Sequence, residues 1–175
     1  MNRREFLIRV ANSEEDFLQE FLDILRKHRT RYCIIGGLAV NAYAEPVVSL
    51  DLDVVIVAEK LEEVLSDLKK LYAVTRQPHS INVKSRKSDL RIQIQTDPRY
   101  QKFLRGASPQ NVLGYRVPVA SARNVLKGKI WAAMDETRRA SKRQKDLADI
   151  IRLVEVDRKL LSFVPIGLKD KLFRK

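Results

Sequence analysis

Two short apolar segments, with a pair of glycines between them, constrain the fold of this chain most. Tyr32–Ile35 is an apolar run that ends at Gly36 and Gly37, and a second run covers Leu52–Val57. Short apolar runs bounded by turn residues are typical of buried strands. The residues from Leu38 to Tyr43 suit a short helix between the two runs. The sequence therefore predicts a strand, a tight glycine turn, a helix and a second buried strand.

The glycine pair carries the first chemical signal. Glycines directly after a strand let the backbone approach a ligand closely and turn its N–H groups toward phosphate oxygens. The helix that follows adds the positive end of its dipole. Gly36 and Gly37 are therefore candidate nucleotide-binding residues, although a glycine pair alone is also a common turn.

Two aspartates at the start of the second strand carry the other signal. The side-chain period of a strand places Asp51 and Asp53 on one face, about 7 Å apart, with Leu52 on the opposite face. Mg²⁺ takes one or two carboxylates together with water and substrate phosphates. The pair is therefore the predicted catalytic and metal-binding group, for Mg²⁺ or Mn²⁺. By itself, an Asp-x-Asp sequence also fits a solvated strand edge or a turn.

The remaining pattern predicts a mixed α/β (α+β) fold whose last third is helical. Helices are expected at 13–28, 61–71, 121–138 and 141–156, a hairpin from strands 80–84 and 90–95, and an edge strand at 115–119. Asp97–Gly114, with two prolines and two glycines, is expected to be loop with one turn of helix. We expect an α/β core over residues 1–119 and a helical part over 120–175 packed on it.

Length and composition indicate a cytoplasmic globular protein. A chain of 175 residues is long enough for one domain, alone or with an appendage. No apolar run approaches the roughly 18 residues that span a bilayer, and the N-terminus has no apolar stretch typical of a signal peptide. Cys33 is the single cysteine, and its apolar neighbours favour an inert buried position over a reactive thiol.

The strong positive charge points to a polyanionic partner. The formal net charge is +12, and the segment Arg138–Lys145, RRASKRQK, holds five cations in eight residues. Residues 121–175 contain fifteen Lys or Arg against seven Asp or Glu. Such a surface attracts nucleic acid, so RNA, including tRNA, is the first partner to expect, through a basic face. An ordinary solvated face or a generally basic proteome remains the alternative.

In this order, with thirteen residues between Gly37 and Asp51, the glycines and aspartates resemble the signature of the nucleotidyltransferase superfamily, which includes polymerase beta-like enzymes. The later segments Val119–Ala133 and Arg138–Ile150 look like those of AbiEii-type nucleotidyltransferases, with a helical lysine and a Lys-Asp-x-x-Asp-Ile type run. The resemblance implies a nucleotidyltransferase fold, binding of Mg²⁺ and an NTP, and transfer of a nucleotide to RNA or protein. It also leaves open an antitoxin protein as a partner.

One position departs from the family pattern. Such sites usually carry a third carboxylate on the strand that here reads Leu90–Gln95, and the matching residue is Gln93. A glutamine offers only a neutral carbonyl oxygen and cannot accept a proton as a base. Asp89 and Asp97 share its strand parity, but each is four residues away, about 13 Å along a strand. Neither is an obvious substitute.

Three other residues have two interpretations each. The resemblance makes Lys129 a candidate phosphate contact, whereas a lone helical lysine is usually solvated. Asp146 and Asp149 either shape the site or form helix-surface pairs with nearby lysines. The two histidines, His28 and His79, lack zinc spacing and receive no role.

The predicted function is metal-dependent nucleotidyl transfer from an NTP to an RNA or protein acceptor. The alternatives are a weakly active or inactive relative that binds nucleotide or RNA, which Gln93 favours, and a plain RNA-binding module.

Overall fold

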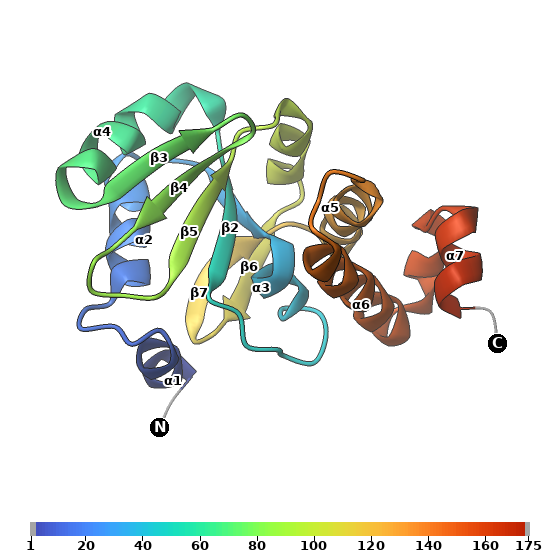
Figure 1. Ribbon diagram of the computed structural model, residues 1–175. Coiled ribbons are helices and arrows are strands. Elements are labelled where there is room, and N and C mark those ends of the chain that lie inside the picture. The colour runs from blue at the N-terminus through green and yellow to red at the C-terminus, as the bar shows by residue number, and fades with distance from the viewer. Residues whose placement is uncertain (1–2, 174–175) are drawn as a thin grey trace.

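A seven-stranded mixed sheet runs through the molecule in the order β3-β4-β5-β2-β1-β7-β6 (Figure 1). The computed structural model describes residues 3–173. The strands are β1 Tyr32–Ile35, β2 Asp51–Ile56, β3 Ala73–Gln77, β4 Ser80–Lys84, β5 Arg91–Gln95, β6 Ser108–Val112 and β7 Tyr115–Val119. The β2–β5 and β1–β7 pairs are parallel, and the other neighbouring pairs are antiparallel.

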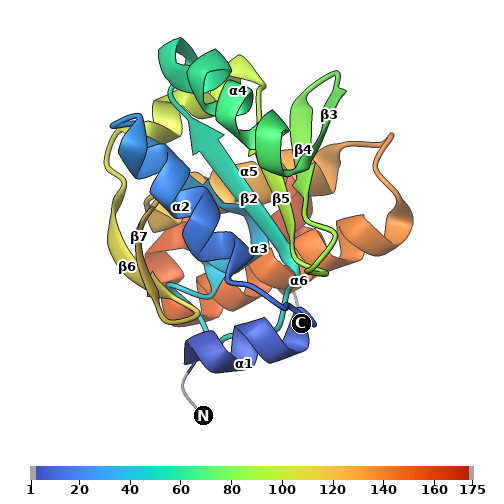
Figure 2. The same cartoon turned by 90° about the vertical axis from the view of Figure 1, so that its left-hand side faces the viewer.

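Helices cover both faces of this sheet. They are α1 Arg3–Val10, α2 Phe17–Lys27, α3 Gly36–Val40, α4 Leu61–Leu71, α5 Ala122–Met134, α6 Ala140–Val156 and α7 Ile166–Phe173, with 3₁₀ turns η1 Ala58–Lys60, η2 Pro98–Leu104 and η3 Arg158–Phe163. Figures 1 and 2 show α2 and α4 on one face, and α5 and α6 on the other. The expected mixed α/β fold class is confirmed.

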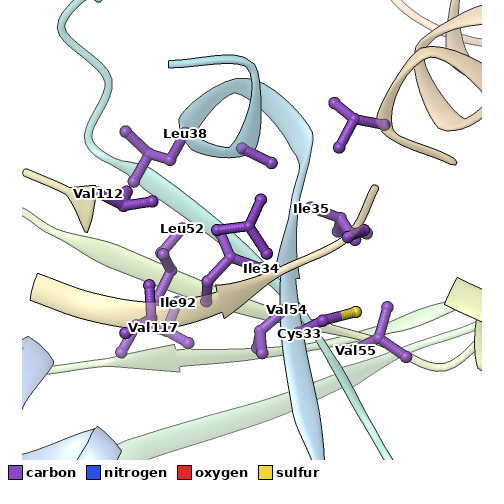
Figure 3. Packing of buried hydrophobic residues seen from close by; sticks show 14 of the residues in the cluster. Cys33, Ile34, Ile35, Leu38, Leu52, Val54, Val55, Ile92, Val112 and Val117 are labelled. Atoms are coloured by element: carbon purple, nitrogen blue, oxygen red, sulfur yellow. The ribbon is translucent and has the colours of Figure 1, made fainter. Parts of the chain in front are cut away.

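Alternation along the central strands separates the core from a polar face. Leu52 and Val54 on β2, like Ile92 and Ile94 on β5, are almost fully buried. They pack with the residues of β1, including Ile34 (Figure 3). The intervening residues of these strands point to the side covered by α5 and α6, so this face of the sheet is free to carry polar chemistry.

The cysteine is inert, as expected. Cys33 lies on β1 within the core and is fully buried (Figure 3). Burial raises the pKa of its thiol to about 12. Since the thiolate is the reactive form, this side chain acts as a small apolar residue.

The N-terminal helix prediction was wrong at its start. Helix α2 begins at Phe17, because the Asp16 carboxylate accepts a hydrogen bond from the Gln19 backbone N–H at 3.0 Å and caps the helix. Ser13 lies before the helix, and its hydroxyl is hydrogen-bonded to the hydroxyl of Ser88, in the turn between β4 and β5. A separate short helix, α1, precedes it and was not predicted.

The edge of the sheet also differs from the prediction. Strand β7 is present where expected, but it lies between β1 and β6, so β6 is the edge strand. The prolines and glycines after Asp97 predicted a loop with one turn of helix there; η2 is that turn, but strand β6 was not predicted. Pro109 of β6 lies opposite Pro118 of β7, and a proline is tolerated at an edge because its missing N–H faces solvent. The opposite edge strand, β3, was missed as well.

Helices α5, α6 and α7 follow β7 in the chain. The bounds of α5 and α6 lie within a few residues of those predicted. Helix α7 lies in the C-terminal tail, where no helix was predicted. The division of the chain at residue 119 stays a prediction. Within residues 3–173, no helix is both long enough and apolar enough to cross a membrane.

Candidate functional site

A pocket of about 340 Å³ opens between the polar face of β2, β4 and β5 and the helices α5 and α6. The five residues singled out from the sequence all line it: Gly36, Gly37, Asp51, Asp53 and Lys129. The fold therefore gathers residues that lie up to 93 positions apart.

The strand register defines what lies beside each aspartate. Asp53 on β2 is aligned with Gln93 on β5, and Gln93 with Asn82 on β4. The position beside Asp53 is thus occupied by a neutral amide, with a second amide beyond it. Asp89 and Asp97 do not line the pocket. A third carboxylate is therefore missing from this row of the sheet.

Gly36 is required by its contact with Asp53. Its φ of +70° lies in the left-handed region, and a Cβ atom added there would lie 2.0 Å from Oδ2 of Asp53. Gly37 differs, because an added Cβ would meet only Asp149 and Ser49, both at 4.0 Å. The first glycine is thus the one that allows the turn to close onto the aspartate strand.

Asp53 is the more perturbed of the two aspartates. Burial, the largest cause, raises the pKa of its carboxyl to about 6, and the negative charge of Asp51 adds to the rise. The positive charges of Lys129, Arg138 and Lys142 oppose it without cancelling it. A desolvated carboxylate of this kind gains from a nearby cation, which restores the stability of its charged form.

Asp51 lies in a second row of the sheet, one that is cationic. It is aligned with Arg91 on β5, and Arg91 with Lys84 on β4. The Arg91 guanidinium lies 2.8 Å from Oδ1 of Asp51, and the Lys142 ammonium of α6 lies 3.2 Å from Oδ2. Both oxygens of this carboxylate therefore have a cationic partner.

Solved structures with the same fold identify the architecture. The chain is similar to the antibiotic-resistance factor ANT(2'')-Ia, with a TM-score of 0.63 and 12% identity over 88% of this chain and 90% of that one. The fold is that of a nucleotidyltransferase. A nucleotidyltransferase-like protein of Paracoccidioides brasiliensis matches with a TM-score of 0.58 and 18% identity, over 92% of this chain and 91% of that one. The lincosamide antibiotic adenylyltransferase LnuA matches with a TM-score of 0.55 and 16% identity, over 81% of this chain and 99% of that one.

No protein-family model matches the sequence, and no curated protein matches it either. The structural likeness establishes a nucleotidyltransferase fold. The narrower resemblance to AbiEii-type enzymes, and the antitoxin partner that it left open, stay predictions.

Within this nucleotidyltransferase fold, Lys129 is not the solvated lysine of the alternative interpretation. It is 8% exposed, and its ammonium lies 3.0 Å from Oδ1 of Asp146 and 2.6 Å from Oδ2 of Asp149. Burial alone would lower the pKa of this ammonium, but the charges of Asp149 and Asp146 outweigh burial and raise it. The interpretation of Asp146 and Asp149 as helix-surface pairs was wrong, because both are buried.

Two arginines complete this ion-pair cluster. Arg138 Nε lies 2.7 Å from Asp146 Oδ2, and Arg152 Nη1 lies 2.6 Å from Asp149 Oδ1. Arg152 also donates to the side-chain oxygen of Asn41 at 3.0 Å and to the carbonyl of Glu45. Helix α6 is thereby tied to the loop between α3 and β2, which carries part of the pocket wall.

Several residues of this pocket were not expected from the sequence, Arg91, Arg152 and Tyr100 among them. The sequence could have pointed to Arg91, because it lies two residues from Gln93 on the same strand and its side chain is therefore on the same face of the sheet. Burial, with a contribution from the nearby Asp53 charge, raises the pKa of the Tyr100 hydroxyl to about 12. Tyr100 lies in η2, which was expected to be mostly loop. No local pattern in that segment pointed to the site.

Proposed function

We propose that this protein is a nucleotidyltransferase that binds a nucleoside triphosphate with Mg²⁺, transfers the nucleotidyl group to an acceptor hydroxyl and releases pyrophosphate. The observation that carries the proposal is the contact between the Gly36 turn and Asp53, with Asp51 on the same strand face, inside the pocket of a nucleotidyltransferase fold. The glycine turn would hold the β- and γ-phosphates. Asp51 and Asp53 would hold Mg²⁺, which neutralises the charge that develops on the transferred phosphate.

The donor set fits one Mg²⁺ that arrives with the nucleotide. Mg²⁺ takes one or two carboxylates and completes its shell with phosphate oxygens and water. Across the described residues, no group of three or more His, Cys, Asp or Glu side chains is placed to hold a metal ion. The two aspartates therefore need the triphosphate as the remaining part of the site.

The other residues of the pocket would position the reactants. Lys129 would act as a point charge toward the phosphates, with Asp146 and Asp149 fixing the place of its ammonium. Because the cluster is buried, its geometry is set before a ligand binds. Holding the α-phosphorus in line with the acceptor oxygen and neutralising its charge together supply most of the rate in this type of reaction.

An anionic acceptor fits this pocket better than a cationic one. Its lining includes the exposed cations Lys84, Arg91 and Lys145. ANT(2'')-Ia is known in complex with adenylyl-2''-tobramycin, and a polyamine antibiotic of that kind would be repelled by the cations here. We propose RNA as the acceptor, since its phosphates would meet this lining and the basic start of α6.

Calorimetric titration of an NTP in the presence of Mg²⁺ tests the proposal. Wild type should bind, and the double variant Asp51→Asn, Asp53→Asn should lose binding while keeping its circular dichroism spectrum. Both substitutions preserve side-chain size and remove only charge. Equal affinity in the two proteins would overturn the assignment of the site.

Gln93 favours a second candidate, a protein of this fold that binds nucleotide but transfers it slowly or not at all. Gln93→Glu places a carboxylate beside Asp53 with little change in volume, and supplies a metal ligand and a base. Incorporation of labelled nucleotide into total RNA and into protein should rise in this variant. If wild type is already fast and Gln93→Glu lowers the rate, Gln93 is not at the third-carboxylate position.

A further inference from the structure

The two cations on Asp51 come from opposite sides of the pocket. Arg91 belongs to β5 in the sheet, and Lys142 belongs to α6 above it. Each bonds a different oxygen of the same carboxylate. A divalent cation that uses Asp51 as a ligand would therefore lie beside both positive charges, and the repulsion between like charges favours displacement of these side chains.

The pocket offers few unpaired carboxylates to a free divalent cation. Its lining holds seven lysines and arginines against four aspartates. Three of these aspartates, Asp51, Asp146 and Asp149, are already ion-paired. Among the described residues, Asp53 forms no ion pair, and its neighbour Gln93 is neutral. A lone Mg²⁺ would enter a net positive field with one unpaired carboxylate to receive it.

A nucleoside triphosphate reverses this balance. The side chains of Arg91, Lys142 and Asp51 are 55%, 40% and 29% exposed, and ion pairs with this exposure contribute little to stability. They can be broken at low cost when another anion is present. Phosphate oxygens accept charge-assisted hydrogen bonds from guanidinium and ammonium groups, so both cations would keep an anionic partner.

We propose that Arg91 and Lys142 exchange partners, from the Asp51 carboxylate to phosphate oxygens, so that the pocket takes up a divalent cation only together with the triphosphate. This inference rests on the proposed function. It makes Arg91 and Lys142 positioning residues that both hold the nucleotide and exclude free metal from Asp51.

Mn²⁺ binding followed by electron paramagnetic resonance tests the exchange, because bound Mn²⁺ loses the sharp signal of the free ion. Titrations would be made with and without a non-hydrolysable α,β-methylene NTP analogue, at constant ionic strength, and the Mn²⁺ that the analogue binds in the absence of protein would be subtracted. Wild type should bind Mn²⁺ at least about tenfold more tightly with the analogue present, which corresponds to about 1.4 kcal/mol.

The double variant Arg91→Gln, Lys142→Gln should bind Mn²⁺ alone about tenfold more tightly than wild type, and the analogue about tenfold more weakly. Lys84→Gln is the matched control. It removes one positive charge from the same lining, one strand beyond Arg91 and with no ion pair to Asp51 among the described residues. Its Mn²⁺ affinity should change by less than about threefold.

The outcomes separate this inference from the proposed function. If wild type binds the analogue but also binds Mn²⁺ equally well without it, the exchange is wrong and nucleotide binding stands. If Lys84→Gln raises the Mn²⁺ affinity as much as the double variant does, the positive field of the whole pocket sets that affinity. The contacts with Asp51 do not, and this result also overturns the exchange. If wild type binds no analogue with any metal, the proposed function itself fails.

Discussion

Gly36 shows most directly how one residue decides the geometry of the site. Gly36→Ala would strain a backbone in the left-handed region, at about 1–2 kcal/mol, and force its methyl group against the Asp53 carboxylate. We expect a clear loss of stability in chemical denaturation, or a displaced β2. Gly37→Ala is the control, since its methyl group meets only ordinary contacts. Its stability should stay within about 1 kcal/mol of wild type, and equal losses in both variants would contradict this account.

Asp53 links the site to the pH dependence of stability. Its pKa of about 6 in the folded protein lies above the ordinary value near 4, so the folded state favours the protonated form. The stability that this proton contributes is present below pH 4 and is lost as the pH rises through about 6. Asp53→Asn should therefore match wild type at pH 4 and exceed it at pH 8 by about 2 kcal/mol, roughly 5 °C in Tm.

Thermal unfolding at both pH values measures this difference. Asp51→Asn serves as the control, because it removes a carboxylate that is paired with Arg91 and Lys142. It should show no gain at pH 8. A gain at pH 4 as large as that at pH 8 for Asp53→Asn would mean that ionisation of Asp53 is not the cause.

At the scale of elements, the buried ion-pair cluster joins α5 to α6. Lys129→Met would leave Asp146 and Asp149 buried without the ammonium between them, and breaking a buried pair in this way costs about 3–5 kcal/mol. Lys127→Met changes a lysine of the same helix that is exposed, so it should cost less than about 1 kcal/mol. Urea denaturation at neutral pH gives both values. Similar costs would show that the cluster adds nothing to the docking of the two helices.

At the scale of the molecule, the net charge of +12 should make RNA binding strongly dependent on salt. Neutralising Arg138, Arg139, Lys142 and Arg143 should lower both the affinity for RNA and the slope of log K against log salt. Because Arg138 and Lys142 also pair with aspartates of the pocket, a second variant is needed. Arg139→Gln with Lys145→Gln changes two exposed residues of the same run.

This second variant should reduce the salt slope by about two, because each of the two cations would neutralise one RNA phosphate in wild type. Fluorescence anisotropy with a labelled RNA over a range of salt concentrations measures the slope. An unchanged slope in both variants would mean that another face of the protein binds RNA, or that none does.

Features that neighbouring residues encode could be predicted before the fold was known. The strands Tyr32–Ile35 and Ser80–Lys84 and the helix Leu61–Leu71 are found with the predicted bounds. Each has a period or an apolar run with clear turn residues at its ends. The glycine and aspartate motifs could be recognised for the same reason, because each is short and bounded by apolar strands.

Which charged groups meet depends on the packing of the whole molecule. The partners Lys129 and Asp146 are 17 residues apart, and Lys142 and Asp51 are 91 apart. No local pattern distinguishes a paired buried lysine from a solvated one, since both occupy the same helical positions. Their pairing depends on how α5 and α6 pack over the sheet, and packing is set by the burial of apolar side chains.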